Sequence, residues 1–288
     1  MYNEASLGIH RIKVLILVKT YPVLSQTYGE LVCTAGLTST GKWIRLYPLP
    51  FRLLSNEKQF SKYQWIEVDV QRKEDDFRPE SYRIVNTETI VLLNTIDTAH
   101  LWRERKKFLY KHLSVHCNIS QLIESAQKEN SLSLAFFKPK KILDFVIENS
   151  EKDWAIDRME SSYNAIHQRS LFDSEEEKER RRTFEIVKKI PYKFSYRFID
   201  ENDTECKLMI EDWELGQLYW NYVTKRKESE KVALAKIRNK YYTDFLKTDT
   251  HFFLGTTKKY HGWANNPFII IGVFYPPKEN QIELDFFD

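Results

Sequence analysis

The sequence predicts an α+β protein: a small barrel-like β-sheet first, a helical middle, then strands mixed with helices. Three observations predict this order. Short segments with alternating apolar and polar residues crowd the first 95 residues, which is typical of small barrels and sandwiches. Charge and helical periodicity dominate the middle. Glycine is absent between Gly41 and Gly216, so tight turns are expected near the two ends.

Five strands are expected in the first region, at residues 13–22, 30–37, 42–48, 64–71 and 81–86. The first of these is apolar on both faces, as in a strand that is covered on both sides. The segment TSTG separates the second strand from the third and predicts a hairpin turn. In the fourth strand, Ile66, Val68 and Val70 share one face and are expected to point into a core.

The middle region is expected to be mostly helical. Residues 97–113 predict a basic helix, and residues 173–189 predict a charged, solvated helix or linker. The second of these is acidic at its start and basic at its end, which suits the helix dipole. Ser120 is expected to cap a further helix. One strand segment is expected within residues 136–149, after the proline.

The last region mixes both kinds of element. Residues 191–200 alternate strictly, with four aromatic rings on one face, and predict a strand that returns over residues 206–212. One broken helix or two helices are expected over residues 213–246. HFFLGTTKK and PFIIIGVFYP predict a final strand pair, and the tail after them is interpreted as a surface or docking segment.

These changes of character suggest three regions, at residues 1–95, 96–190 and 191–288. The last region either stands alone or forms one continuous domain with the N-terminal strands.

The composition restricts the partners and the compartment. The net charge is only +3, so bulk charge alone does not indicate nucleic acid, although aromatic residues reach 14%. The longest apolar runs are too short to span a bilayer, and the N-terminus lacks a secretory apolar segment. Three cysteines suit a reducing compartment. We therefore expect a cytoplasmic protein that does not enter a membrane.

No familiar cofactor or metal motif is present. The phosphate-binding patterns GxxxxGK[ST] and GxGxxG are missing, as are CxxC and GxSxG, so no nucleotide cofactor is expected. His112 and His116 have the i, i+4 spacing of zinc ligands on one helix face, but no third ligand is indicated. Ordinary buried or surface histidines are the preferred interpretation, and neither a metal nor a cofactor is assigned.

The densest group of chemically useful side chains lies in MIEDWELGQLYWN, where a strand is expected to end and a helix to begin. Asp212 and Glu214 flank Trp213 there. A carboxylate at a helix start is a common cap, and this interpretation is favoured. Beside aromatic walls, however, poor solvation raises the pKa of a carboxylate and suits acid–base catalysis.

Two other segments interleave rings with cations. GKWIRLYPLPFR places Trp43, Arg45 and Tyr47 on one strand face, either as a surface cation–π stack or as a platform for a flat ring. The loop GTTKKYHGWANNPF is either an ordinary hydrophilic hairpin loop or a phosphate clamp with a stacking wedge. The residues expected to contact nucleic acid are Lys19, Tyr21, Trp43, Arg45, Tyr47, Arg52, Trp213, Lys258, Lys259, His261 and Trp263.

The strands that carry KTYP, VCTAG and WIRLYP resemble small barrels of the PUA and ASCH type, which bind RNA or modified bases. This resemblance covers less than a third of the chain. In size, in lacking a cofactor motif and in placing a carboxylate among rings, the chain is also similar to bacterial anti-phage DNA glycosylases. The water-activating GQDPYH-type motif of uracil glycosylases is absent.

Three functions follow, in order of preference. The first is a metal-independent DNA glycosylase that removes a flipped modified base, with Asp212 or Glu214 activating water or stabilising the oxocarbenium-like sugar. The alternative is a non-catalytic reader of modified DNA or RNA. The third is a metal-dependent nuclease of the PD-(D/E)xK type, for which Glu205 and Lys207 supply only the ExK half.

Overall fold

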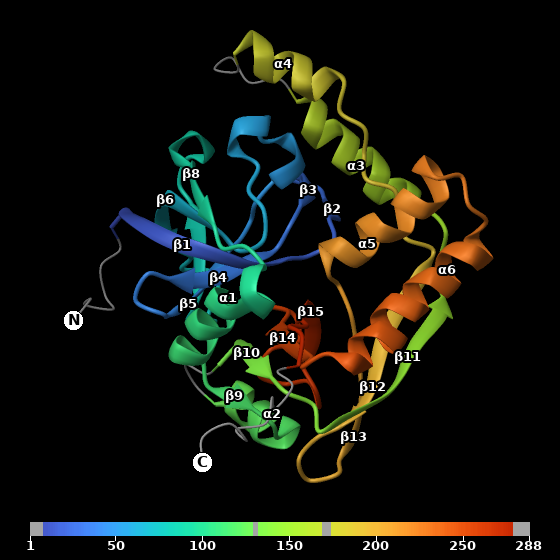
Figure 1. Cartoon of the computed structure of the whole chain (residues 1–288). Helices are drawn as coiled ribbons and strands as arrows, with labels where there is room; N and C mark the ends of the chain where they lie inside the picture. Colours follow the sequence, from blue (N-terminus) through green and yellow to red (C-terminus); the bar gives the residue numbers. More distant parts are fainter. Residues whose placement is uncertain (1–7, 129–131, 169–173, 279–288) are drawn as a thin grey trace.

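The computed structural model describes residues 8–128, 132–168 and 174–278 and has the expected α+β class (Figure 1). A closed five-stranded barrel forms the N-terminal part, and the C-terminal strands and helices pack beside it. Most of the tail that was interpreted as a docking segment, residues 279–288, lies outside the described residues. No helix in the described part of the chain is both long and apolar enough to cross a bilayer.

The N-terminal sheet contains six strands: β1 (His10–Lys19), β4 (Thr34–Thr38), β5 (Trp43–Leu46), β6 (Gln64–Arg72), β7 (Ser81–Ile84) and β8 (Val91–Thr95). Neighbours follow the order β1–β4–β5–β7–β6, and β6 pairs again with β1 to close the barrel. β8 adds to the first half of β6. The five expected strands are all present, and the predicted hairpin between β4 and β5 is confirmed.

Alternating side chains fill the barrel. The three expected inward residues of β6, Ile66, Val68 and Val70, are buried in one cluster with Ile44 and Leu46 of β5. Each strand therefore turns one apolar face inward, as its period of two requires.

β1 is covered on both faces, as its sequence predicts. Val14 and Ile16 point into the barrel cluster. Leu15 and Leu17 belong instead to a second cluster that contains Phe253 of the C-terminal part. One strand thus contributes to two cores, and the barrel packs directly on the C-terminal sheet.

Short elements connect the barrel strands. A small hairpin of β2 (Val23–Ser25) and β3 (Gly29–Leu31) precedes β4. Three 3₁₀ turns lie at Phe51–Leu53, Asn56–Lys58 and Thr87–Thr89.

Two helices follow the barrel, α1 (Ala99–His112) and α2 (Ile119–Gln127). The cap of α2 differs from the prediction. The Asn118 side chain accepts a hydrogen bond from the backbone N–H of Gln121 at 3.1 Å, so Asn118 is the cap. Ser120 lies inside the first turn, because the helix begins one residue before it.

The C-terminal part contains two sheets. β9 (Val115–His116), β10 (Leu134–Phe137), β14 (His251–Thr256) and β15 (Phe268–Phe274) form one sheet in the order β15–β14–β10–β9. β11 (Lys141–Asn149), β12 (Tyr192–Ile199) and β13 (Glu205–Met209) form the other. The predicted pairs β12–β13 and β14–β15 are confirmed as antiparallel. Phe194, Tyr196 and Phe198 are buried, as the alternation in β12 predicts.

Four further helices complete the described fold: α3 (Ile156–His167), α4 (Glu175–Arg182), α5 (Trp213–Trp220) and α6 (Glu230–Arg238). The charged helix α4 begins with a capping box between Ser174 and Glu177. The expected broken helix is present, because π-helical turns at Asn221–Lys225 and Asn239–Asp244 follow α5 and α6, with a 3₁₀ turn at Phe245–Lys247 after them. In Figure 1, α3 lies beside the β2–β3 hairpin with α4 above it, α5 lies between α3 and α6, and α6 lies beside β11 and β12.

Strands β1 and β4 approach closely at Gly36, which pairs with Ile16 of β1. A Cβ atom at this position would lie 2.1 Å from the backbone oxygen of Leu15. We expect Gly36→Ala to lower the free energy of unfolding by about 1–3 kcal/mol in a denaturant titration. Gly8→Ala is the control, because a Cβ there meets nothing nearer than 4.0 Å. Equal midpoints for both variants would contradict the prediction.

Candidate functional site

The strand–helix junction places the two predicted catalytic carboxylates at the start of α5. Asp212 is the helix cap: its Oδ1 accepts a hydrogen bond from the backbone N–H of Glu214 at 2.8 Å. The same segment is tied to the end of β1, because the N–H of Tyr21 donates to the oxygen of Glu211 at 3.0 Å. The cap interpretation of Asp212 is therefore confirmed.

Lys62 completes a buried ion pair that the sequence analysis missed. Its Nζ lies 2.9 and 2.8 Å from the two carboxylate oxygens of Asp212. The same ammonium lies 3.5 Å from Oε2 of Glu214. The side chains of Lys62 and Asp212 are 6% and 2% exposed, whereas that of Glu214 is 48% exposed. Glu214 is the carboxylate of this group that a ligand can reach.

Burial and charge act in opposite directions on this group. Burial raises the pKa of Asp212, and the Lys62 ammonium opposes that rise. Burial lowers the pKa of Lys62, but Asp212 and Glu214 outweigh it, so the pKa is raised overall. Burial also raises the pKa of Glu211.

Lys19, expected to contact nucleic acid, lies in the same place but is buried. Its Nζ donates to the backbone oxygen of Phe60 at 2.9 Å and lies over the rings of Phe51 and Trp213, at 4.3 and 5.3 Å from their centroids. Burial, with the neighbouring Lys62 ammonium, lowers the pKa of Lys19 to about 8. In this arrangement Lys19 and Trp213 pack together and offer little surface to a ligand.

Tyr63 and Arg105 extend this group. The Arg105 guanidinium lies 3.9 Å from the centroid of the Tyr63 ring. The Tyr63 hydroxyl is buried and has no hydrogen-bond partner among the described residues. The negative charge of Glu214 acts to raise the pKa of both Tyr63 and Arg105. Arg105 lies in the basic stretch 103–107 of the predicted helix, whereas Tyr63, in the loop before β6, gave no signal in the sequence.

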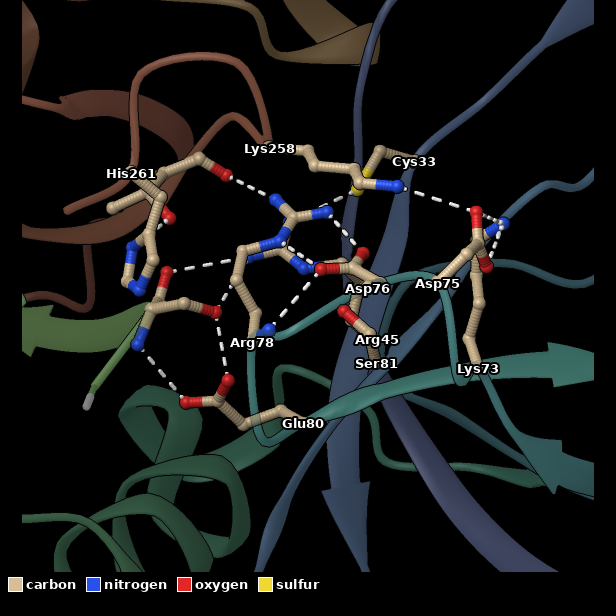
Figure 2. Close-up of polar contacts among 12 residues, drawn as sticks. Cys33, Arg45, Lys73, Asp75, Asp76, Arg78, Glu80, Ser81, Lys258 and His261 are labelled. Carbon is tan, nitrogen blue, oxygen red and sulfur yellow. Dashed lines mark hydrogen bonds and ion pairs between the residues drawn. The ribbon is translucent and has the colours of Figure 1, made fainter. Parts of the chain in front are cut away.

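Arg45 needs a correction. It was expected to hold phosphate, but it is 2% exposed and belongs to the polar network shown in Figure 2. Its Nη1 donates to the Sγ of Cys33 at 3.3 Å, and its Nη2 donates to the Oγ of Ser133 at 3.0 Å. The Ser133 hydroxyl in turn donates to Glu80 at 2.7 Å. The guanidinium thus joins β5 to the start of β10 instead of facing a ligand.

Asp76 and Arg78 form the second part of this network (Figure 2). Nη2 and Nε of Arg78 lie 2.6 and 2.9 Å from the two carboxylate oxygens of Asp76. Its Nη1 donates to the backbone oxygen of Thr256, at the end of β14, at 2.6 Å. Burial raises the pKa of Asp76, but bonding to Arg78 outweighs it and lowers the pKa to about 2.

The other predicted residues of the 41–52 segment also serve packing. The Trp43 ring lies edge-on to Phe253, with the centroids 6.1 Å apart. Tyr47 is half-buried, and burial raises its pKa. Neither alternative for this strand face, a surface stack or an open platform, describes it. The face is covered because the C-terminal sheet packs against the outside of the barrel.

Arg52 and Tyr21 hold the segment that follows α4. Arg52 Nη1 contacts both carboxylate oxygens of Glu30, at 2.8 and 2.7 Å, and its Nη2 donates to the backbone oxygen of Glu185. The Tyr21 hydroxyl donates to the backbone oxygen of Lys188 at 2.8 Å. These contacts give both predicted binding residues a structural role.

The loop between β14 and β15 remains accessible. Trp263 is 66% exposed and Tyr260 is 43% exposed, with their ring centroids 5.5 Å apart. Lys259 lies over the Tyr260 ring, and Lys258 Nζ lies 3.2 Å from a carboxylate oxygen of Asp75. These side chains include three of the four predicted for this loop.

The fourth predicted loop residue, His261, is 4% exposed and lies 2.9 Å from the Thr256 hydroxyl. Burial lowers its pKa. Beside it, the ring of Phe77 is 55% exposed, with its centroid 5.3 Å from that of His261. Phe77 lies between β6 and β7, so the barrel and the C-terminal loop share one exposed surface.

The residues considered for metal binding do not converge. α1 ends at His112, whereas His116 lies in β9, so the two histidines do not share a helix face. Glu205 pairs with Arg197, and Lys207 pairs with Glu148. The structure groups no three potential ligands of the His, Cys, Asp or Glu type within its described ranges.

Two family models match this chain. Residues 10–111 match a domain of unknown function (DUF8758), and residues 114–288 match a second domain of unknown function (DUF8757). The chain belongs to the DUF8757 family. The boundary between the two matches lies where α1 ends, so the DUF8757 part begins with β9. No curated protein matches the chain.

Because the pKa of Asp76 is lowered, we expect the protein to lose folding stability in acid. The carboxyl has a pKa of about 2 instead of 3.8, so its ionised form stabilises the fold above pH 4. This stability is lost as the pH falls from about 4 to about 2, and amounts to about 2 kcal/mol. Asp76→Asn should lack this loss in denaturant titrations across that range. Asp153→Asn, which changes an exposed carboxylate elsewhere on the chain, should behave like the wild type; an unchanged acid response in Asp76→Asn would contradict the assignment.

Proposed function

We propose that the protein binds nucleic acid through the exposed surface formed by Phe77, Lys258, Lys259, Tyr260 and Trp263, here called the aromatic–lysine surface. The observation that carries this proposal is the exposure of three rings beside two lysines. Bases stack on exposed rings while phosphates pair with ammonium groups, and this combination is common in proteins that bind single strands.

Recognition without chemistry is the version that the geometry supports best. The Asp212 carboxylate already binds the Lys62 ammonium through both oxygens and caps α5. The Asp212 side chain is only 2% exposed, so a water molecule and a substrate cannot reach its carboxylate together. The reader of modified DNA or RNA therefore moves ahead of the glycosylase.

Base removal remains the second candidate because of Glu214. This carboxylate is about half exposed, lies 3.5 Å from the Lys62 ammonium and adjoins the aromatic group around Trp213. A carboxylate beside rings can stabilise an oxocarbenium-like sugar or activate water. In this version Glu214 acts on the sugar, and Lys62 and Asp212 hold its helix in place.

Trp263→Ala tests the aromatic–lysine surface. If bases stack on Trp263, affinity for a single-stranded oligonucleotide should fall by about 1–3 kcal/mol. Replacing both Lys258 and Lys259 with Gln should flatten the log–log dependence of affinity on salt by about 0.7 for each phosphate that is no longer neutralised. Filter binding at several salt concentrations measures both effects.

Tyr163→Ala is the matched control for that experiment, because Tyr163 is 53% exposed but lies on α3. It should leave affinity unchanged. A wild-type protein that retains no oligonucleotide at low salt would contradict every nucleic-acid function proposed here.

Glu214→Gln separates the two candidate functions. If Glu214 acts in base removal, formation of abasic sites in modified DNA should fall by two or more orders of magnitude, with little change in affinity. Asp212→Asn should mainly lower the melting temperature, because it breaks the buried pair with Lys62. The absence of abasic sites with wild-type protein, on modified and unmodified DNA, would exclude base removal from these substrates.

A further inference from the structure

A groove opens beside the aromatic–lysine surface, at the ends of β6 and β7. It has a volume of about 690 Å³, which is within the usual range of ligand pockets, roughly 300–1,000 Å³. We call it the basic groove. Its lining includes Tyr28, Pro48, Arg72, Lys73, Asp75 and Arg83.

The groove and the aromatic–lysine surface are continuous. Asp75 lines the groove, and one of its carboxylate oxygens lies 3.2 Å from the Nζ of Lys258 (Figure 2). Phe77 follows Asp75 by two residues and is exposed on the aromatic–lysine surface. One extended ligand can therefore contact both.

The groove carries more positive than negative charge. Arg72, Lys73 and Arg83 line it, against the two carboxylates of Glu74 and Asp75. Lys258 adds a fourth cation from outside this lining, because its ammonium binds Asp75 together with that of Lys73. The net positive charge of the groove attracts an anionic ligand.

The two guanidinium groups are held in place by neutral oxygens. Arg72 donates to the backbone oxygens of Ser81 and Asp76. Arg83 donates to the side-chain oxygen of Gln71 and is exposed. Across the described ranges, neither forms an ion pair with a carboxylate. Their charge is thus available for phosphate, which arginine binds well.

An apolar wall faces these cations. Tyr28, in the turn between β2 and β3, is 45% exposed, and Pro48 and Pro50 line the groove with it. A base can stack on this ring while its phosphate pairs with the neighbouring cations. Stacking on Tyr28 requires a free base face, which an unpaired strand offers and a duplex hides.

We propose that the basic groove binds a single strand of nucleic acid, with phosphates at Arg72, Lys73 and Arg83 and a base on Tyr28. The inference rests on the proposed nucleic-acid function and extends it, because the strand continues onto the aromatic–lysine surface. A free nucleotide shares this chemistry but would not span the two surfaces.

Arg83→Gln and Tyr28→Ala test the groove with a 12-nucleotide single strand, its duplex and a mononucleotide. Tyr28→Ala should weaken binding of the single strand about tenfold. Arg83→Gln should flatten its salt dependence by about 0.7. Wild-type protein should bind the duplex and the mononucleotide more weakly than the single strand. Lys247→Gln and Tyr163→Ala, which alter exposed side chains elsewhere, should change nothing.

The outcomes also separate this inference from the proposed function. If Trp263→Ala weakens binding while both groove variants bind as the wild type does, the groove assignment is overturned and the aromatic–lysine surface stands. If the groove variants weaken binding and Trp263→Ala does not, the proposed surface fails and the groove stands. Equal affinity for the mononucleotide or the duplex would overturn the single strand as the ligand. Melting curves establish that each variant is folded.

Discussion

The strand β1 must be covered on both faces, and the rest of the structure follows from that requirement. Val14 and Ile16 are buried inside the barrel, whereas Leu15 and Leu17 are buried against a second apolar surface outside it. The C-terminal sheet supplies that surface through Phe253. Two segments that match separate families thus share one core, and the described parts of both pack as a unit.

Polar groups that this packing buries need hydrogen-bond partners. Several charged residues form these bonds across the join between the barrel and the C-terminal part. Arg45 binds Ser133, and Arg78 binds the oxygen of Thr256, each across the join between barrel and sheet. Lys62 and Asp212 do the same between the barrel and α5. An unpaired charge at any of these positions would be costly, so their role in holding the two parts together explains their burial.

The sequence predicts the elements well and the site poorly, for a physical reason. A period of two reports which side chains share a face, so the barrel strands and the β14–β15 pair could be predicted. It does not report what covers that face, and Trp43 and Arg45 were therefore assigned to a ligand instead of to the second core. Lys62 gave no signal, because it lies in a loop far along the chain from Asp212. Asp212 and Glu214 do lie at the predicted strand–helix junction, and Lys258, Lys259 and Trp263 are exposed in the loop between β14 and β15.

The loop between β14 and β15 is held by hydrogen bonds at its start and within the loop. Its start is fixed by the bond from Arg78 to Thr256, and the Trp263 indole donates to the oxygen of Lys259 at 2.6 Å. These bonds, with the contact between the Tyr260 and Trp263 rings, restrict where the two rings can lie before a ligand binds. A loop restrained in this way loses less entropy on association than an unrestrained one, so contacts made there contribute more to affinity.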